Sequence, residues 1–141
     1  MKQARGGRFV AQLLESVPLT MADIWFTDST KCPTKVDEKC DIPPANTGNA
    51  AKHCNPYLQH ETKAIDLLGI VTLGKGATVR TLEALDIDSE QANDVSVEES
   101  YGHSEFDTPY PIVISLHWAQ RHVAQKEWVP PVKQAIFDIV E

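Results

Sequence analysis

The sequence has 141 residues, of which 42% are hydrophobic and 23% are charged, a composition typical of one folded globular domain rather than of a disordered chain. No apolar run is long enough to span a bilayer, and the basic start does not read as a secretory signal, so we expect a cytoplasmic protein with no membrane partner. The net charge of −7 argues against general attraction to nucleic acid but allows a local basic groove.

The first third of the chain predicts a helix, a strand and a loop. Apolar residues at helical spacing, stopped by Pro18, predict a helix over residues 8–17. The β-prone run at residues 24–27 predicts a short strand. Prolines and charges over residues 30–47 predict a loop.

The middle of the chain predicts a helix, a buried strand and a second helix. The first helix is expected over residues 49–68, closed by Gly69. The compact apolar run at residues 70–73 predicts a buried parallel strand. Glycines after this strand are expected to open a helix over residues 77–85.

The last third combines an acidic segment, an apolar strand and a helix. Residues 86–108 are acidic and irregular, with a short strand expected at 95–97. Residues 111–116 predict another apolar strand, and Pro130 is expected to begin the last helix.

Strands that alternate with helices predict βαβ units and a parallel sheet covered on both faces. Ligands bind such sheets beyond the carboxyl ends of the strands. We therefore expect the chemistry at three turns, which contain Asp28-Ser29, Gly74-Lys75-Gly76 and His117-Trp118.

Five segments resemble, in order and spacing, motifs of uracil-DNA glycosylases of the iron–sulfur, thermophile and archaeal type. They are Gly7-Arg8 with Leu13-Leu14, Phe26 to Pro33, Cys54 to Leu58, Val71 to Lys75 and Ile112 to His117. The fourth matches the family's Val-Thr-Leu-Gly-Lys turn residue for residue. The resemblance, which covers roughly residues 7–125, implies a single domain over residues 1–141. It also implies a three-layer α/β/α sandwich with a short, mainly parallel sheet, and base-excision activity on uracil or another deaminated base in DNA.

The departures from the family are as informative as the matches. The family's first strand, which ends in Gly-Glu-Ala-Pro-Gly and supplies the acid that positions the attacking water, has no counterpart here. The resemblance therefore predicts a sheet without that strand, either with a gap or with direct pairing of its neighbours. A partial chain, a mis-called gene start or a decayed paralogue would each explain this. The alternative function is a catalytically inactive relative that binds nucleic acid or a protein partner through the same cleft.

The resemblance gives roles to three residues that would touch the base. His117 would donate a hydrogen bond to the uracil oxygen and stabilise the leaving base as an anion; the alternative is a half-buried histidine without a ligand. Asp28 replaces the family's uracil-reading asparagine. A carboxylate only accepts hydrogen bonds, which suits the amine of cytosine better, unless Asp28 is merely a turn residue. Phe26 or Trp25 would stack nearby, unless these aromatic side chains belong to the core.

Other residues are candidates for contact with the DNA backbone. Gly74, Lys75 and Gly76 could hold a phosphate at a helix N-terminus, or could simply form a tight turn. Trp118, which replaces the family's proline, could press into DNA with Arg121 beside it, or could cover an apolar gap beside the sheet.

The three cysteines predict free thiols or a metal site before disulfides. Cys32 and Cys54 match two of the family's four iron–sulfur ligands, and Cys40 leaves the set one short. The alternative metal site is a zinc site of the three cysteines, Cys40 included, with His53 or His60 as the fourth ligand. We expect no cofactor, with a cluster formed only if further ligands are supplied.

Overall fold

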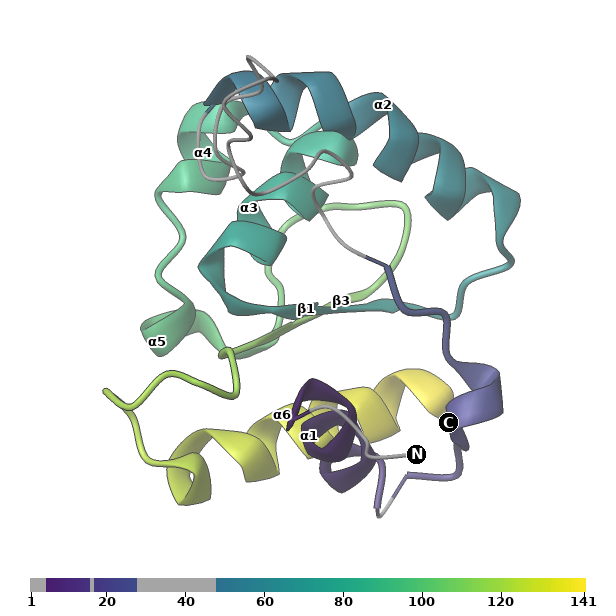
Figure 1. The fold of residues 1–141 in the computed structure, drawn as a ribbon, viewed down its shortest axis with the longest axis vertical. Coiled ribbons are helices and arrows are strands. Elements are labelled where there is room, and N and C mark those ends of the chain that lie inside the picture. Colours follow the sequence, from purple (N-terminus) through teal and green to yellow (C-terminus); the bar gives the residue numbers. More distant parts are fainter. Residues whose placement is uncertain (1–4, 16, 28–47) are drawn as a thin grey trace, which may run out of the picture.

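The chain has a mixed α/β fold, as the sequence predicts, with a small sheet between two layers of helices (Figure 1). The computed structural model describes residues 5–15, 17–27 and 48–141. Within these ranges the sheet has three strands in the order β1-β3-β2. β1 (Ile70–Leu73) pairs in parallel with β3 (Ile112–Ser115), and β2 (Gly102–His103) pairs antiparallel with the other edge of β3.

Helices lie on both faces of this sheet. In Figure 1, α2, α3 and α4 lie on one face, and α1 and α6 lie on the other. The described helices are α1 (Arg5–Leu13), the 3-10 helix η1 (Met21–Asp23), α2 (Gly48–Ala64), α3 (Gly74–Ala84), α4 (Ser89–Asn93), α5 (Val97–Ser100) and α6 (Gln125–Val140). None of the helices in the described ranges has the length and apolar character that crossing a bilayer requires.

β3 is the centre of the core. All four of its residues are buried, because helices cover both faces of the sheet, and a strand covered on both faces is mostly apolar. Val113 packs with α1 and α6 in one cluster, whereas Ile112 and Ile114 pack with α3 and the α4 region in the other. The alternation of side chains along the strand therefore joins the two helical layers through one short strand.

The strands predicted at residues 70–73 and 111–116 are present as β1 and β3, although β1 is only partly buried, whereas the sequence predicts a buried strand. Two other predicted strands are wrong. Residues 24–27 form no strand, and Trp25 within them is 64% exposed. Among the residues that the structure describes, no strand pairs with them to accept their backbone hydrogen bonds. The strand predicted at 95–97 is also wrong, because Val97 begins the short helix α5.

The helices are confirmed in place but shifted in their bounds. α1 begins before the predicted residue 8, α2 ends at Ala64 rather than 68, and α3 begins directly at Gly74. α6 begins at Gln125, before Pro130 rather than at it. Burial of Trp128 explains this early start, because Trp128 shares a helical face with the later core residues of α6.

A polar contact joins β2 to α6 at the surface. The Asp138 carboxylate accepts a hydrogen bond from the Gln134 amide at 2.8 Å and lies 3.2 Å from His103 Nε2. These partners, Gln134 first and then His103, lower the pKa of Asp138 below its ordinary value. The ionised carboxylate is therefore favoured in the folded protein.

A lowered pKa in the folded state gives a stability that depends on pH in a known direction. We expect Asp138→Asn to lower the melting temperature above the ordinary aspartate pKa. The difference should shrink as the pH falls through the lowered pKa of the folded protein. Thermal unfolding between pH 7 and pH 2 measures this, with Asp107→Asn at an exposed loop position as the control. A difference that grows toward low pH would contradict the assignment.

Candidate functional site

The ends of β1 and β3 bring two of the three predicted turns together. In the parallel register Leu73 lies opposite Ser115, so both strands end at the same edge of the sheet. Gly74 and His117 follow directly. A Cβ atom added at Gly74 would lie 3.2 Å from the Cβ of His117, and Gly74 has a φ of +89°, which favours glycine. Gly74 therefore lets the backbone of α3 approach His117 closely.

Buried hydroxyl groups hold the turn after β1 in place. Thr78 donates a hydrogen bond to the Gly74 carbonyl oxygen at 2.8 Å. Its oxygen also lies 2.8 Å from the hydroxyl of Thr72. Since a hydroxyl has one proton, Thr72 is the donor in that second bond. The chain of hydrogen bonds ties β1 to the first turn of α3 and fixes the orientation of the glycine turn.

The position of the proton on the neutral His117 ring follows from a hydrogen bond with Ala119. The Ala119 backbone N–H donates to His117 Nδ1 at 3.1 Å. A ring nitrogen that accepts a hydrogen bond carries no proton, so the neutral imidazole carries its proton on Nε2. The half-buried ring also stacks on Trp118, with centroids 3.8 Å apart. His117 is thus held as a hydrogen-bond donor at the carboxyl edge of the sheet.

Trp118 joins the site to the core beneath it. Its ring centroid lies 6.4 Å from that of Phe9, which in turn lies 5.4 Å from that of the buried Trp128. These contacts are those of a side chain that covers the core, the second of the two roles considered for Trp118. Its contact with DNA stays a prediction.

A hollow of about 1230 Å³ begins at these turns and runs along β1. The predicted site residues Phe26, Gly74, Lys75, Gly76, His117 and Trp118 all line it. Arg121 is exposed and does not line it. Asp28 and Cys32 lie outside the described residues, and the structure gives only the backbone of Cys54, in α2. Among the side chains described, no three metal-binding groups come together.

One contact between residues that line the hollow, Thr27 and Glu61, was not predicted from the sequence. The Thr27 hydroxyl donates a hydrogen bond to Glu61 Oε2 at 2.6 Å, and both residues line the hollow. This bond joins the exposed segment after η1 to α2, across 34 positions of sequence. Glu61 belongs to no motif and sits among polar residues of a helix, so nothing in the sequence marks it as a lining residue.

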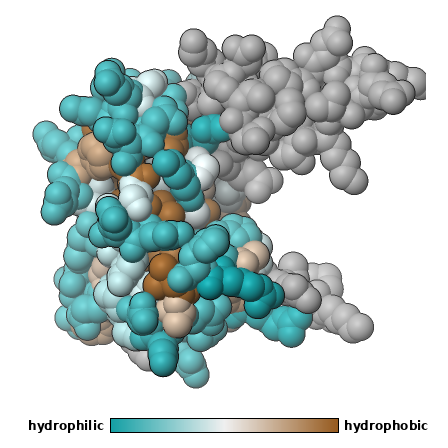
Figure 2. Space-filling model, turned by 90° about the vertical axis from the view of Figure 1, so that its left-hand side faces the viewer, coloured by the Kyte–Doolittle hydropathy of each residue, from teal (hydrophilic) through white to brown (hydrophobic). Residues whose placement is uncertain are grey.

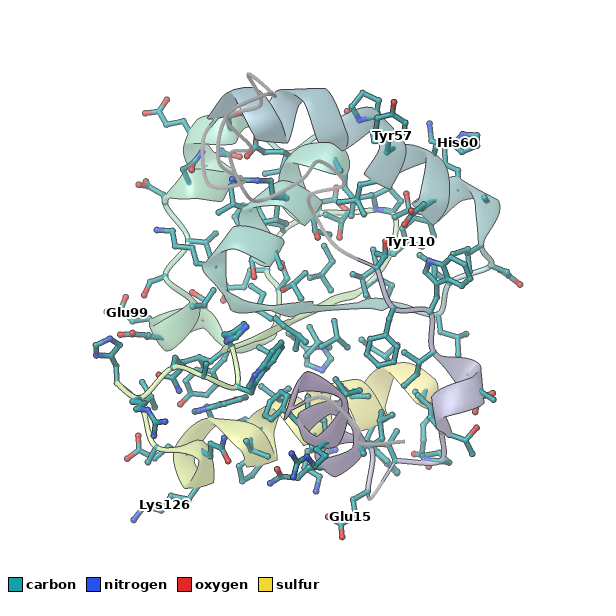
Figure 3. All side chains as sticks on the ribbon, viewed as in Figure 1. Glu15, Tyr57, His60, Glu99, Tyr110 and Lys126 are labelled. Carbon is teal, nitrogen blue, oxygen red and sulfur yellow. The ribbon has the colours of Figure 1, made fainter. Side chains whose placement is uncertain are left out.

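The side of the molecule beyond the strand ends is mixed in charge. Figure 2 looks at this side, where hydrophilic residues surround a smaller hydrophobic area. Glu99 projects from α5 and Lys126 from the start of α6 (Figure 3). Because this side carries groups of both signs and the net charge of the chain is −7, we expect no broad positive field here, and an anion would be held by local contacts such as Lys75.

Comparison of the chain with protein-family models, with curated proteins and with solved structures finds no match.

Proposed function

We propose that the chain is a uracil-DNA glycosylase-like DNA N-glycosylase with that family's α/β/α sandwich, which acts on uracil or another deaminated base. The observation that carries the proposal is the hydrogen bond from the Ala119 N–H to His117 Nδ1, at the carboxyl edge of the sheet, which leaves Nε2 as the donor of the neutral ring.

In this proposal the bond between C1′ of the sugar and the base nitrogen breaks, and the base leaves with the electron pair. The negative charge that develops on the base oxygen is stabilised by a hydrogen bond from His117 Nε2. A neutral donor fixed in direction before the reaction costs little reorganisation. Water then adds to C1′ and releases a proton to solvent.

Other residues of the hollow would hold the flipped nucleotide. Phe26 is 52% exposed and lines the hollow, so its ring is available to stack on a base. Lys75 is exposed at the start of α3, where it can contact a phosphate together with the first amides of the helix. Asp28 would accept a hydrogen bond from an N–H group on the edge of the base.

A glycosylase assay tests the proposal. Single- and double-stranded oligonucleotides carrying uracil, hypoxanthine or xanthine, or containing cytosine as the target base, are incubated with the protein, and abasic sites are quantified. We expect His117→Ala to reduce the cleavage rate by about 100-fold or more. His122→Ala, at an exposed histidine in the same loop, is the matched control and should leave the rate unchanged.

Two results would contradict the proposal. One is the absence of cleavage of every base, and the other is cleavage that survives His117→Ala. Binding of the oligonucleotides without cleavage would instead support the catalytically inactive relative, and the loss of that binding in His117→Ala would place it in the same hollow.

A further inference from the structure

Within residues 5–15, 17–27 and 48–141, one edge of β1 has no strand beside it. β1 stands at the end of the sheet order, next to β3 alone. The Ile70 N–H donates to the Pro111 carbonyl oxygen at 2.9 Å, which shows that Ile70 faces β3. Since successive residues of a strand direct their N–H and C=O groups to opposite edges, Val71 faces the free edge. Its backbone makes no hydrogen bond within the described part of the chain.

Exposed apolar side chains gather along this free edge. Of the large hydrophobic residues that are exposed in the described ranges, all but Tyr57 line the hollow beside β1. They are Trp25 (64%), Phe26 (52%), Leu68 (64%) and Val71 (40%). A contiguous apolar surface of this kind, unlike scattered apolar residues, marks a binding site.

The hollow has walls on both faces of the sheet plane. Val10 of α1 and Ile136 of α6 line it from one helical layer, and Leu58 and Ile65 line it from the α2 side. The extended segment at residues 24–27 lines it as well. A strand lying beside β1 would be covered on both faces, so its residues would have to be apolar throughout rather than alternating.

The two ends of β1 carry opposite charges. Asp66 lies a few residues before the strand and Lys75 lies directly after it, and both line the hollow and are exposed. The positive end of α3 also points to the Lys75 end. A segment that fits this groove therefore has a basic residue at the end that meets Asp66 and an acidic residue at the end that meets Lys75.

We propose that the free edge of β1 binds an extended apolar segment of another protein, which adds to the sheet as a further strand. Main-chain hydrogen bonds with Val71 would hold it, and the apolar walls would select its side chains. β1 has four residues, so the bound core is about four or five residues long. This proposal rests on the edge of β1 and not on the chemistry of His117.

The shape of the groove favours a single extended segment over a second copy of the chain. The free edge lies inside a hollow, with helices on both sides of it. In a second copy the same edge is equally recessed. Two recessed edges cannot approach to the 4.7–4.9 Å spacing, roughly, of paired strands, whereas a separate extended peptide can enter.

Binding of two capped synthetic peptides tests the proposal. One reads Lys-Lys-Val-Ile-Val-Ile-Val-Glu-Glu, and the other has the lysines and glutamates exchanged. Since the backbone groups of β1 fix whether an added strand runs parallel or antiparallel, one peptide meets opposite charges at both ends of the groove in that direction and the other meets like charges. We expect one peptide to bind at least about tenfold more tightly than the other. In the double variant Asp66→Lys with Lys75→Glu, the preference should be reversed.

Hydrogen exchange followed by NMR gives the second readout. The tighter peptide should slow exchange of the Val71 amide by about tenfold or more, and it should do so in His117→Ala as well. Loss of glycosylase activity would leave this result untouched. Failure of both peptides to bind, equal affinities, or binding without protection of Val71 would overturn the proposal. Formation of a dimer by the chain that excess peptide does not dissociate would overturn it too.

Discussion

Replacement of Trp128 by alanine is expected to lower the free energy of unfolding by about 3–5 kcal/mol. Trp128 is fully buried and belongs to the cluster in which α1 and α6 pack against β3. Its ring lies 5.4 Å from Phe9, so alanine would leave a cavity between α6 and α1. Urea unfolding followed by circular dichroism measures the loss.

Trp128→Phe separates the volume of this side chain from its polar atom. The indole Nε1 is buried and has no hydrogen-bond partner within the described part of the chain. Phenylalanine therefore removes an unsatisfied donor while keeping most of the ring, and we expect a loss of only about 1–2 kcal/mol. A loss as large as that of the alanine variant would show that the indole makes a hydrogen bond in solution.

Gly74→Ala is expected to destabilise the protein by about 2–4 kcal/mol. The φ of +89° is unfavourable for any residue with a Cβ atom, and the new Cβ would crowd His117 at 3.2 Å. The strain acts at the junction of the two turns, so the His117 ring should move as well. Urea unfolding gives the loss, and the chemical shifts of the His117 ring report the movement.

Gly76→Ala is the matched control two residues later. Gly76 lies in α3, it is exposed, and a Cβ atom there would meet nothing within 4 Å. Alanine in a helix should therefore stabilise the protein by about 0.5–1 kcal/mol. A lower free energy of unfolding in Gly74→Ala together with a higher one in Gly76→Ala would establish the conformation of the turn. Equal effects would mean that Gly74 does not hold a positive φ.

The elements that could be predicted are those whose signal is local. β1 and β3 are short, mostly apolar runs, and the burial of β3 along its whole length explains its composition, whereas β1 is only partly buried. Residues 24–27 have a similar composition, but a strand also needs a partner, and the sequence does not show where partners lie. The start of α6 depends on burial of Trp128 by α1, a distant segment.

Part of the candidate site could be predicted from the topology of parallel sheets. Because parallel strands end at one edge of a sheet, the Gly74 turn and His117 could be placed together from the sequence. The proton on His117 could not, because it depends on the backbone N–H of Ala119 in a turn of specific geometry. The Thr27–Glu61 contact could not either, because it joins two segments that share no pattern.

The recessed edge of β1 also bears on how the protein behaves when concentrated. Unprotected edge strands pair with one another and lead to aggregation, and fibrils grow only when each added strand offers a new edge to the next. Residues 24–27 line the same hollow as β1, so a strand seated beside β1 would lie within the hollow rather than at an open edge. We therefore expect the recessed position of this edge, together with a net charge of −7, to oppose the growth of polymers from it.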